Sequence, residues 1–205
     1  MTPDYWEEAC RVLARRDPIL RKIIKTYPGI SLRHRGAPFM TLARAIVGQQ
    51  ISVKAAQSVW LRVVALVGKI EPVNVLAVTL VQLRLCGLSQ RKCEYILDLA
   101  AHFENGRLKP RTWNKLDDET LIELLSEVKG IGRWTAEMFL MFNLLRPNVL
   151  PVDDIGLQRA MAIHYNGEEK LAFDEMRAVA AKWQPWRSVA TWYLWRSLDP
   201  IPVEY

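Results

Sequence analysis

The segment VKGIGRWTAEMFLMF, residues 128–142, combines a short glycine turn with a strongly helical sequence. Gly130 and Gly132 are separated by one isoleucine, and Lys129 and Arg133 flank them. Glycine allows positive φ and close approach by another backbone. A helix starting near Arg133 leaves free N–H groups at its N-terminus, where anions bind. The turn therefore predicts a clamp for one nucleic-acid phosphate, which would contact backbone rather than bases.

The same five residues also have a simpler interpretation. A glycine between two helices commonly serves as the C-cap of the first helix, with no ligand involved. The turn alone leaves both interpretations open.

Composition limits the class of protein. The 205 residues include 28 Lys and Arg against 22 Asp and Glu, which gives a net charge of +6 and permits an anionic partner. Half of the residues are hydrophobic, but no apolar run approaches about 18 residues, so we expect no membrane partner. The three cysteines, Cys10, Cys86 and Cys93, are too scattered for a disulfide framework or a four-cysteine metal site. The first residues are acidic and amphipathic, so we expect no signal peptide and a reduced cytoplasmic setting.

Helical periodicity dominates the chain. The clearest apolar stripe recurs at i, i+3, i+4, i+7 and i+8, at Phe39, Leu42, Ala43, Ile46 and Val47. N-cap and stop residues predict further helices from Thr2-Pro3, from Ser52 to Gly68, from Ser89 to Gly106, over 117–128, and from about Arg133, Asp154, Glu168 and Pro185. The segment 73–81 is the weakest helical prediction. We expect an all-α fold of roughly ten short helices, in two helical lobes with a cleft.

Two adjacent acids, Asp153 and Asp154, follow Pro151 in the stretch NVLPVDDIGLQRAM. Aspartate is a favoured N-cap and suits the first turn of a helix, so both acids could be purely structural. Alternatively, one caps the helix while the other projects into a cleft. A carboxylate placed there could stabilise a sugar cation or orient a water molecule.

Taken together, these segments resemble the helix-hairpin-helix DNA glycosylase superfamily, in particular its 3-methyladenine DNA glycosylase II (alkylation-repair) branch. LSEVKGIGRWTAEMFLMF is similar to the family's hairpin and following helix, LPVDDIGLQRA to its catalytic-aspartate segment, and ARAIVGQQISVKAA to its DNA-inserting loop. GLSQRKCEYILDLA and WQPWRSVATWYLWR also match the branch. The matches extend from about residue 39 to 198, in the family's order.

The resemblance implies roles for individual residues. Asp154 would be the catalytic carboxylate and Asp153 structural. Gln50 would wedge into the duplex, with Gln49 as the alternative. The implied DNA-binding residues are Gln49, Gln50, Lys54, Lys129, Gly130, Ile131, Gly132 and Arg133. No cofactor is required for the chemistry, but in relatives main-chain carbonyls of the hairpin hold Na⁺ or K⁺. The matching carbonyls here are those of Ser126, Val128 and Ile131.

The resemblance also implies a base pocket. The chain has eight tryptophans, and Trp134 and Trp195 would face the everted base, with Met138 one turn beyond Trp134. An electron-rich aromatic wall attracts a cationic alkylated purine. The alternative is that these tryptophans are core residues, as tryptophan in a helical bundle usually is.

Three departures from the family pattern bear on activity. Members that also cut the strand carry a lysine where this chain has Trp134, so no Schiff base and no lyase activity are expected. The C-terminal four-cysteine iron–sulfur site that some relatives carry is not expected here, because no cysteine follows Cys93. The larger bacterial relatives carry an extra N-terminal domain, whereas here we expect only a helical extension, residues 1–37.

The resulting prediction is a single glycosylase unit, residues 1–205, with two interwoven lobes at roughly 38–110 and 111–205. It would be a monomer that excises alkylated purines such as 3-methyladenine or 7-methylguanine from double-stranded DNA, in the bacterial cytoplasm or a eukaryotic nucleus. The main alternative is a non-catalytic helix-hairpin-helix protein that binds damaged DNA. A helical protein-interaction domain would explain neither the clamp nor the acid.

Overall fold

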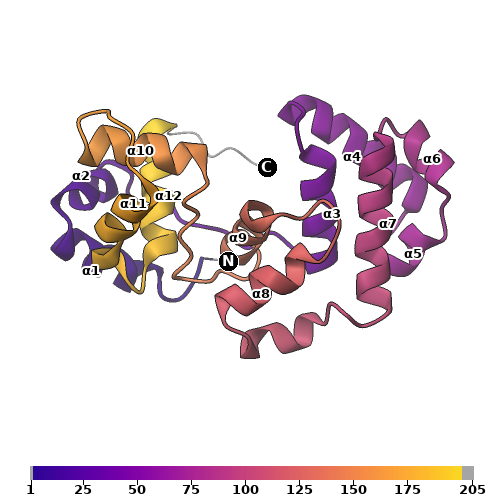
Figure 1. Ribbon diagram of the computed structural model, residues 1–205, viewed down its shortest axis with the longest axis horizontal. Helices are drawn as coiled ribbons and strands as arrows, with labels where there is room; N and C mark the ends of the chain where they lie inside the picture. Colours follow the sequence, from indigo (N-terminus) through magenta and orange to yellow (C-terminus); the bar gives the residue numbers. More distant parts are fainter. Residues whose placement is uncertain (1, 200–205) are drawn as a thin grey trace. The chain divides into compact units, whose positions relative to one another are not determined.

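The computed structural model describes residues 2–199, and within this range the chain is all-α, as predicted, without a β-strand (Figure 1). In chain order the helices are α1 (Trp6–Arg16), α2 (Pro18–Thr26), α3 (Pro38–Gly48), α4 (Val53–Val67), α5 (Pro72–Leu76), α6 (Leu80–Leu85), α7 (Gln90–Glu104), α8 (Asp118–Ser126), α9 (Arg133–Phe142), α10 (Ile155–Tyr165), α11 (Phe173–Ala180) and α12 (Arg187–Leu198), with 3₁₀ turns at Pro110–Lys115 and Ala181–Trp183. None of the helices described has the length and apolar character needed to cross a bilayer.

The chain forms two compact units. Within the described range, unit 1 comprises residues 2–34 and 140–199, and unit 2 comprises residues 35–139. This division differs from the boundaries expected at residues 37 and 110. The expected boundaries follow the order of helices along the chain, whereas the units follow packing. The N-terminal segment is therefore part of a core, and the hairpin at 128–133 shares its unit with the predicted DNA-inserting loop.

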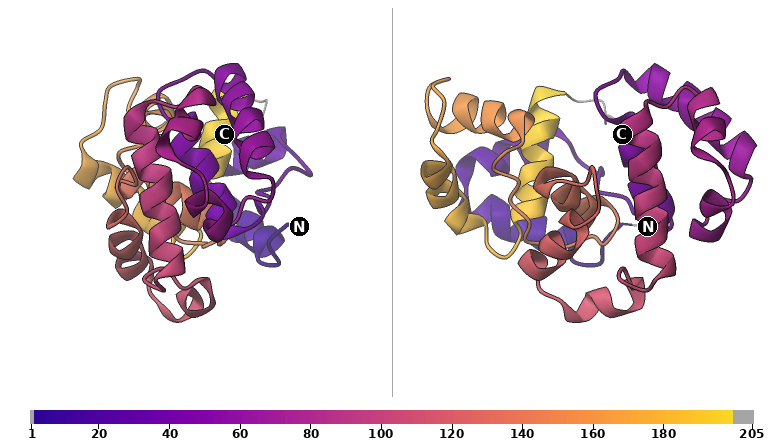
Figure 2. Two further views of the ribbon diagram at one scale, coloured as in Figure 1. Left: turned by 90° about the vertical axis from the view of Figure 1, so that its right-hand side faces the viewer. Right: turned by 45° about the vertical axis from the view of Figure 1, so that its right-hand side comes forward.

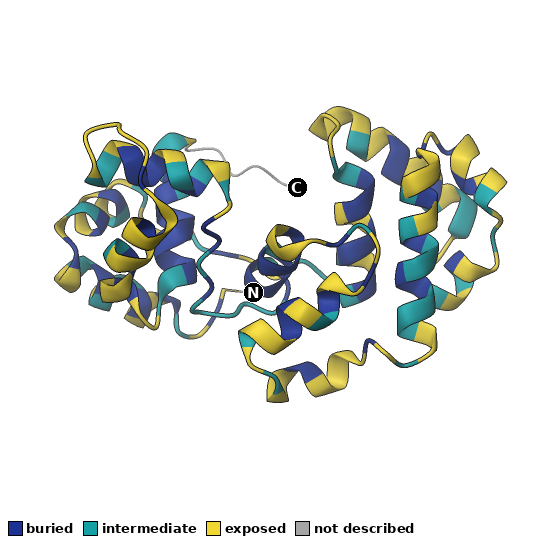
Figure 3. Cartoon of the chain, viewed as in Figure 1, coloured by how far each residue is buried: buried dark blue, intermediate teal, exposed yellow. Residues whose placement is uncertain are grey.

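In unit 1, α12 is the central helix. It packs against α1, α2 and α10, and almost every residue from Ser188 to Leu194 is buried (Figure 3). Trp6 of α1 meets Trp192 edge to face, with ring centroids 5.3 Å apart. This geometry is a favoured arrangement for aromatic pairs. The first helix is thus held to the last one by aromatic packing.

Asp17 organises the polar interior of unit 1. Its fully buried carboxylate caps α2 and accepts hydrogen bonds from the Tyr165 hydroxyl at 2.8 Å and the Trp183 indole N–H at 2.9 Å. The Lys182 ammonium lies 3.1 Å away. Burial raises the pKa of Asp17, but the hydrogen bonds from Trp183, Tyr165 and Lys182 outweigh it, so its pKa lies below the ordinary value of 3.8.

In unit 2, α7 is the central helix, with α3, α5 and α6 packed against it (Figure 2). The predicted stripe of α3 is the buried one: Phe39, Leu42, Ala43, Ile46 and Val47. A chain of aromatic edge contacts extends from Phe39 through Phe103 and Trp113 to Phe139 of α9. This chain ties the helix after the hairpin to the core of the same unit.

Two predicted helix starts are confirmed by their caps. The Ser52 hydroxyl accepts the N–H of Ala55 at the start of α4, and the Ser89 hydroxyl accepts the N–H of Lys92 at the start of α7. Both are the favoured N-cap interaction.

Two other predicted starts are wrong. The first helix begins at Trp6, because the Thr2 hydroxyl pairs with Ser31 instead of capping a helix. The helix expected from Glu168 begins at Phe173, since Glu168 has a positive φ of 74° that no helix interior adopts. The segment 73–81 contains parts of α5 and α6, separated where Thr79 starts a new capping box. The last helix, α12, begins at Arg187, close to the start expected at about Pro185.

Candidate active site

Asp154 of unit 1 is held by two donors. It is the N-cap of α10, and its Oδ1 accepts the backbone N–H of Leu157 at 2.7 Å. The same oxygen accepts the indole N–H of Trp195, on α12, at 2.8 Å. Asp154 is half-buried, whereas Asp153 beside it is exposed. Of the two acids that the sequence offers as caps, Asp154 is the one that caps the helix.

Two further residues complete this group. Phe142, the last residue of α9, stacks on the Trp195 indole with centroids 5.9 Å apart and planes within 11°. Gly156 lies beside the hydrogen bond between Asp154 and Trp195. A Cβ on Gly156 would stand 3.1 Å from Asp154 Oδ1 and 3.2 Å from Trp195 Nε1. Sequence reasoning missed both residues. A glycine at the second position of a predicted helix was the one available signal for Gly156.

The hairpin of unit 2 is a tight turn between α8 and α9. The N–H of Ile131 donates to the Val128 carbonyl at 3.0 Å, and Gly130 has a φ of 82°. The Tyr95 ring of α7 covers Gly130 so closely that a Cβ there would lie 2.1 Å from a ring carbon. Gly132 differs from the expectation. It lacks a positive φ and has open space at its Cβ, and its carbonyl accepts the N–H of Ala136 in α9.

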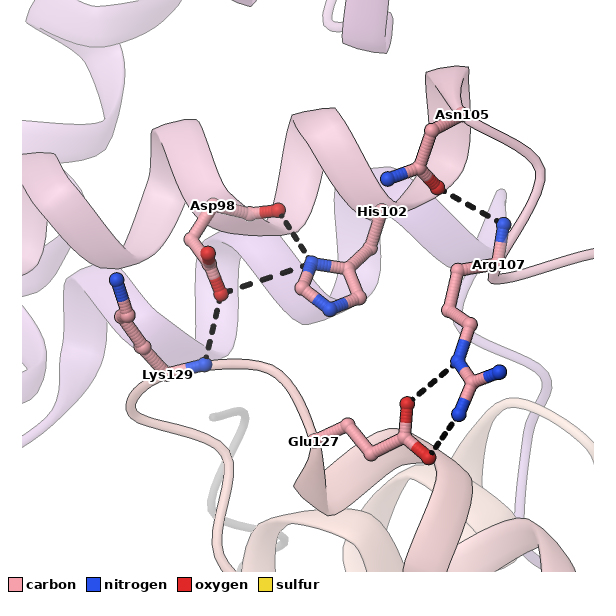
Figure 4. A network of polar contacts seen from close by, with 6 residues as sticks. All are labelled: Asp98, His102, Asn105, Arg107, Glu127 and Lys129. Atoms are coloured by element: carbon pink, nitrogen blue, oxygen red, sulfur yellow. Dashed lines mark hydrogen bonds and ion pairs between the residues drawn. The ribbon is translucent and has the colours of Figure 1, made fainter.

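Helix α7 also holds the turn by hydrogen bonds (Figure 4). The Asp98 carboxylate accepts the backbone N–H of Lys129 at 2.9 Å and lies 3.6 Å from His102 Nδ1. After α7, Arg107 forms a two-pronged ion pair with Glu127, both N–O distances being 2.6 Å. The turn is therefore held in place by contacts within unit 2 that need no ligand.

The two cations of the hairpin have different surroundings. The Lys129 side chain is exposed. The Arg133 guanidinium instead makes a two-pronged pair with Glu119 at 2.6 and 2.8 Å and a 3.0 Å bond to the buried Glu137. The hydrogen bond to Glu119 raises the pKa of Arg133, and that to Arg133 lowers the pKa of Glu119. Much of the charge of Arg133 is thus neutralised within unit 2.

The predicted DNA-inserting loop, between α3 and α4, contacts the hairpin. The Gln49 amide donates to the Gly130 carbonyl at 2.8 Å. The Lys92 ammonium donates to the main-chain carbonyls of Val47 and Gln49 at 2.8 and 2.6 Å, and burial lowers its pKa. Gln50 is exposed and has a φ of 58°, in the left-handed region. The two glutamines therefore differ. The Gln49 side chain is hydrogen-bonded to the hairpin, whereas Gln50 is exposed at the surface of the loop.

The remaining predicted residues also have defined surroundings. Trp134 is 38% exposed and Met138, one turn later on α9, is half-buried. Lys54 is exposed in the first turn of α4. Among the residues described, no three His, Cys, Asp or Glu side chains cluster as metal ligands would. The structure thus joins Asp154 with Trp195 in unit 1 and, separately, Gln49 with the hairpin in unit 2.

The chain is similar to known repair proteins. Residues 43–186 match the model of the HhH-GPD superfamily base excision DNA repair proteins. A DNA-3-methyladenine glycosylase of Bacillus subtilis is 30% identical over 91% of this chain, which spans just under two thirds, 65%, of that relative's length. Among solved structures, a DNA-3-methyladenine glycosidase from Bacillus halodurans aligns with a TM-score of 0.87 and 37% identity, covering 93% of this chain and 89% of that one. The Schizosaccharomyces pombe 3-methyladenine DNA glycosylase Mag1, in complex with abasic DNA, aligns with a TM-score of 0.80 and 27% identity, covering 97% and 98%.

The family model covers most of the chain, and the relatives share its helical architecture. The chain therefore belongs to the HhH-GPD superfamily of base excision DNA repair proteins, in its alkylation-repair branch.

Proposed function

We propose that this protein is a monofunctional DNA glycosylase that flips alkylated purines out of duplex DNA and hydrolyses their glycosidic bonds. The observation that carries the proposal is the fixed carboxylate of Asp154, half-buried and held by the N–H groups of Leu157 and Trp195. Relatives of this branch are named for the excision of 3-methyladenine.

The carboxylate suits the chemistry. A purine alkylated at N3 or N7 carries positive charge and is a good leaving group. The base departs with the bonding electrons and becomes neutral, which leaves cationic character on the deoxyribose. Asp154 would stabilise this charge, and water would then add to C1′ and lose its proton to the solvent. Such fixed electrostatic stabilisation is strongest where water is excluded. The products are a free base and an abasic site.

Base recognition would use aromatic side chains. The exposed Trp134 ring, with Met138 beside it, and the Trp195–Phe142 stack each offer an apolar, electron-rich surface. Cation–π contact with such a surface contributes about 0.5–2 kcal/mol. It favours a charged alkylated base over its neutral parent.

Base flipping costs a few kcal/mol, which contacts with the DNA must offset. The hairpin, with the N-terminus of α9 and the exposed Lys129, would bind one backbone phosphate. Gln50 would fill the space left by the everted base. Its exposure and left-handed backbone support this choice over Gln49, whose amide is bonded to Gly130.

A monovalent cation fits the chemistry of the hairpin. The Ser126 carbonyl is among the last four of α8, which lack partners inside the helix, and the Val128 carbonyl faces the turn, where it accepts the N–H of Ile131. With the Ile131 carbonyl, these oxygens would hold Na⁺ or K⁺, which would add positive charge to the phosphate site.

Base-release chromatography on methylated duplex DNA tests the function. The wild-type protein should release 3-methyladenine and 7-methylguanine, and Asp154→Asn should release neither while still binding DNA. Equal behaviour of both proteins, with binding and no released base, would instead indicate a damage-binding protein without catalysis.

The absence of strand cleavage is a separate test. Trp134 supplies no amine for a Schiff base, so the products should remain full-length until alkali cleaves the abasic site. A covalent adduct trapped by borohydride would contradict the monofunctional assignment.

A further inference from the structure

Gly156 is the second residue of α10 and has an ordinary negative-φ backbone. Glycine within a helix is unfavourable by about 0.5–1 kcal/mol relative to alanine. Its usual justification, a positive φ, does not apply at this position. The space around the residue offers another reason.

A Cβ on Gly156 would crowd three atoms at once. It would lie 3.1 Å from Asp154 Oδ1, 3.2 Å from Trp195 Cδ1 and 3.2 Å from Trp195 Nε1. These are the two partners of the 2.8 Å indole–carboxylate hydrogen bond. The indole has little room to retreat, because Phe142 stacks on it and the rest of α12 around it is buried.

We infer that Gly156 is a positioning residue for the catalytic carboxylate: its missing side chain lets the Trp195 indole reach Asp154. Trp195 accordingly acts as a hydrogen-bond donor as well as a wall for the base. This inference rests on the proposed function of Asp154.

The bond matters because both donors use one oxygen. Leu157 N–H, from the first turn of α10, and Trp195 N–H, from α12, approach Oδ1 from different elements. Turning the carboxylate about its side-chain torsion would break two bonds from different helices, rather than the cap bond alone. The second donor fixes its plane, and pre-set orientation of a charged group is what an electrostatic catalyst needs.

The first experiment compares Gly156→Ala with the wild-type protein in single-turnover base release. We expect the rate to fall about tenfold or more, because a hydrogen bond to a charged group is lost or lengthened, while the affinity for abasic DNA stays the same. If Gly156 were only a helical residue, alanine would raise the melting temperature and leave the rate unchanged. That result would overturn the inference. Gly48→Ala in α3, where the new Cβ meets Ala56 at an ordinary 3.9 Å, calibrates the helix-propensity effect on stability.

A second comparison uses Trp195→Phe, which removes the donor and the crowded indole atoms. If Gly156 acts through Trp195, adding Gly156→Ala to Trp195→Phe should slow base release no further. Additive losses would contradict the inference.

The last readout does not depend on activity. The indole ¹H–¹⁵N resonance that Trp195→Phe removes should shift in Asp154→Asn and in Gly156→Ala. An unmoved resonance in Gly156→Ala would overturn the inference. This signal can be read even if the wild-type protein releases no base, so failure of the proposed function and failure of the inference are distinguishable.

Discussion

The side-chain amide of Gln49 donates to the backbone carbonyl of Gly130 at 2.8 Å, across 81 residues of sequence. The loop that would enter the duplex is therefore bonded to the turn that would hold the phosphate. Both belong to unit 2, and α7 contributes Lys92 to the loop and Asp98 and Tyr95 to the turn. A single helix thus contacts both of the segments that are proposed to bind DNA.

Gly130→Ala should disrupt the hairpin, whereas Gly132→Ala should not. At Gly130 an alanine combines a φ of 82° with a collision with the Tyr95 ring, and we expect a loss of about 2 kcal/mol or more in unfolding free energy. At Gly132 the backbone is ordinary and the space open. Thermal unfolding of both variants checks the contrast. Equal losses would show that the Tyr95 contact does not determine the turn.

Substitutions of Gln49 and of Gln50 should have different effects on stability and on excision. Gln50→Gly removes the side chain but relieves a left-handed residue, so stability should be kept or rise by up to about 1 kcal/mol while excision from duplex DNA slows. Gln49→Ala should lower stability, because it breaks the bond to Gly130. Excision rates together with urea unfolding separate the two. An unchanged excision rate of Gln50→Gly would exclude Gln50 as the side chain that inserts into the duplex.

Lys129→Ala and Arg133→Ala offer a matched pair of charge deletions. Lys129 is exposed, so its loss should leave stability intact and reduce the slope of log K against log salt for DNA binding by about 0.9. Loss of Arg133 removes the 3.0 Å ion pair with the buried Glu137 and should destabilise the fold by about 2 kcal/mol or more. Salt-dependent anisotropy titrations and thermal unfolding measure the two effects. A purely DNA-binding role for Arg133 would instead leave its variant as stable as the wild type.

Asp17→Asn should destabilise unit 1 by about 2 kcal/mol or more at neutral pH, since the Lys182 and Tyr165 contacts lose a buried carboxylate. The folded-state pKa of Asp17 lies below its unfolded value of 3.8, so protons bind the unfolded chain more readily. The stabilisation is therefore fully present above that value and is lost as the pH falls through the folded-state pKa. Urea titrations at neutral and acidic pH should show the difference between variant and wild type shrinking on acidification. A constant difference would exclude the ionised form as its source.

Local signals explain what the sequence predicts well. The α3 stripe and the Ser52 and Ser89 caps depend on residues within one or two turns, and all three are present in the structure. Asp154 is also recognisable as a helix cap from its neighbours alone. Where the local signal misleads, as at Thr2, a contact with distant Ser31 takes the side chain that would have capped a helix.

The features that the sequence does not predict depend on contacts between residues far apart in the chain. The donor from Trp195 lies 41 residues beyond Asp154, and Tyr95 lies 35 residues before Gly130, so neither partner follows from spacing. The charge of Arg133 illustrates the same limit. Its position beside the turn favours a phosphate ligand, but Glu119 from α8 occupies its guanidinium.

Unit 1 is built from both ends of the chain, and this has a consequence for biosynthesis. During translation, the residues of unit 2 are synthesised before those of α10 and α12. The apolar faces of α1 and α2, with Leu13, Leu20 and Ile23, cannot be buried against α12 until α12 has been synthesised. Unit 2 can fold before then. Until α12 is made, the nascent protein therefore exposes the apolar faces of α1 and α2 to chaperones and to aggregation.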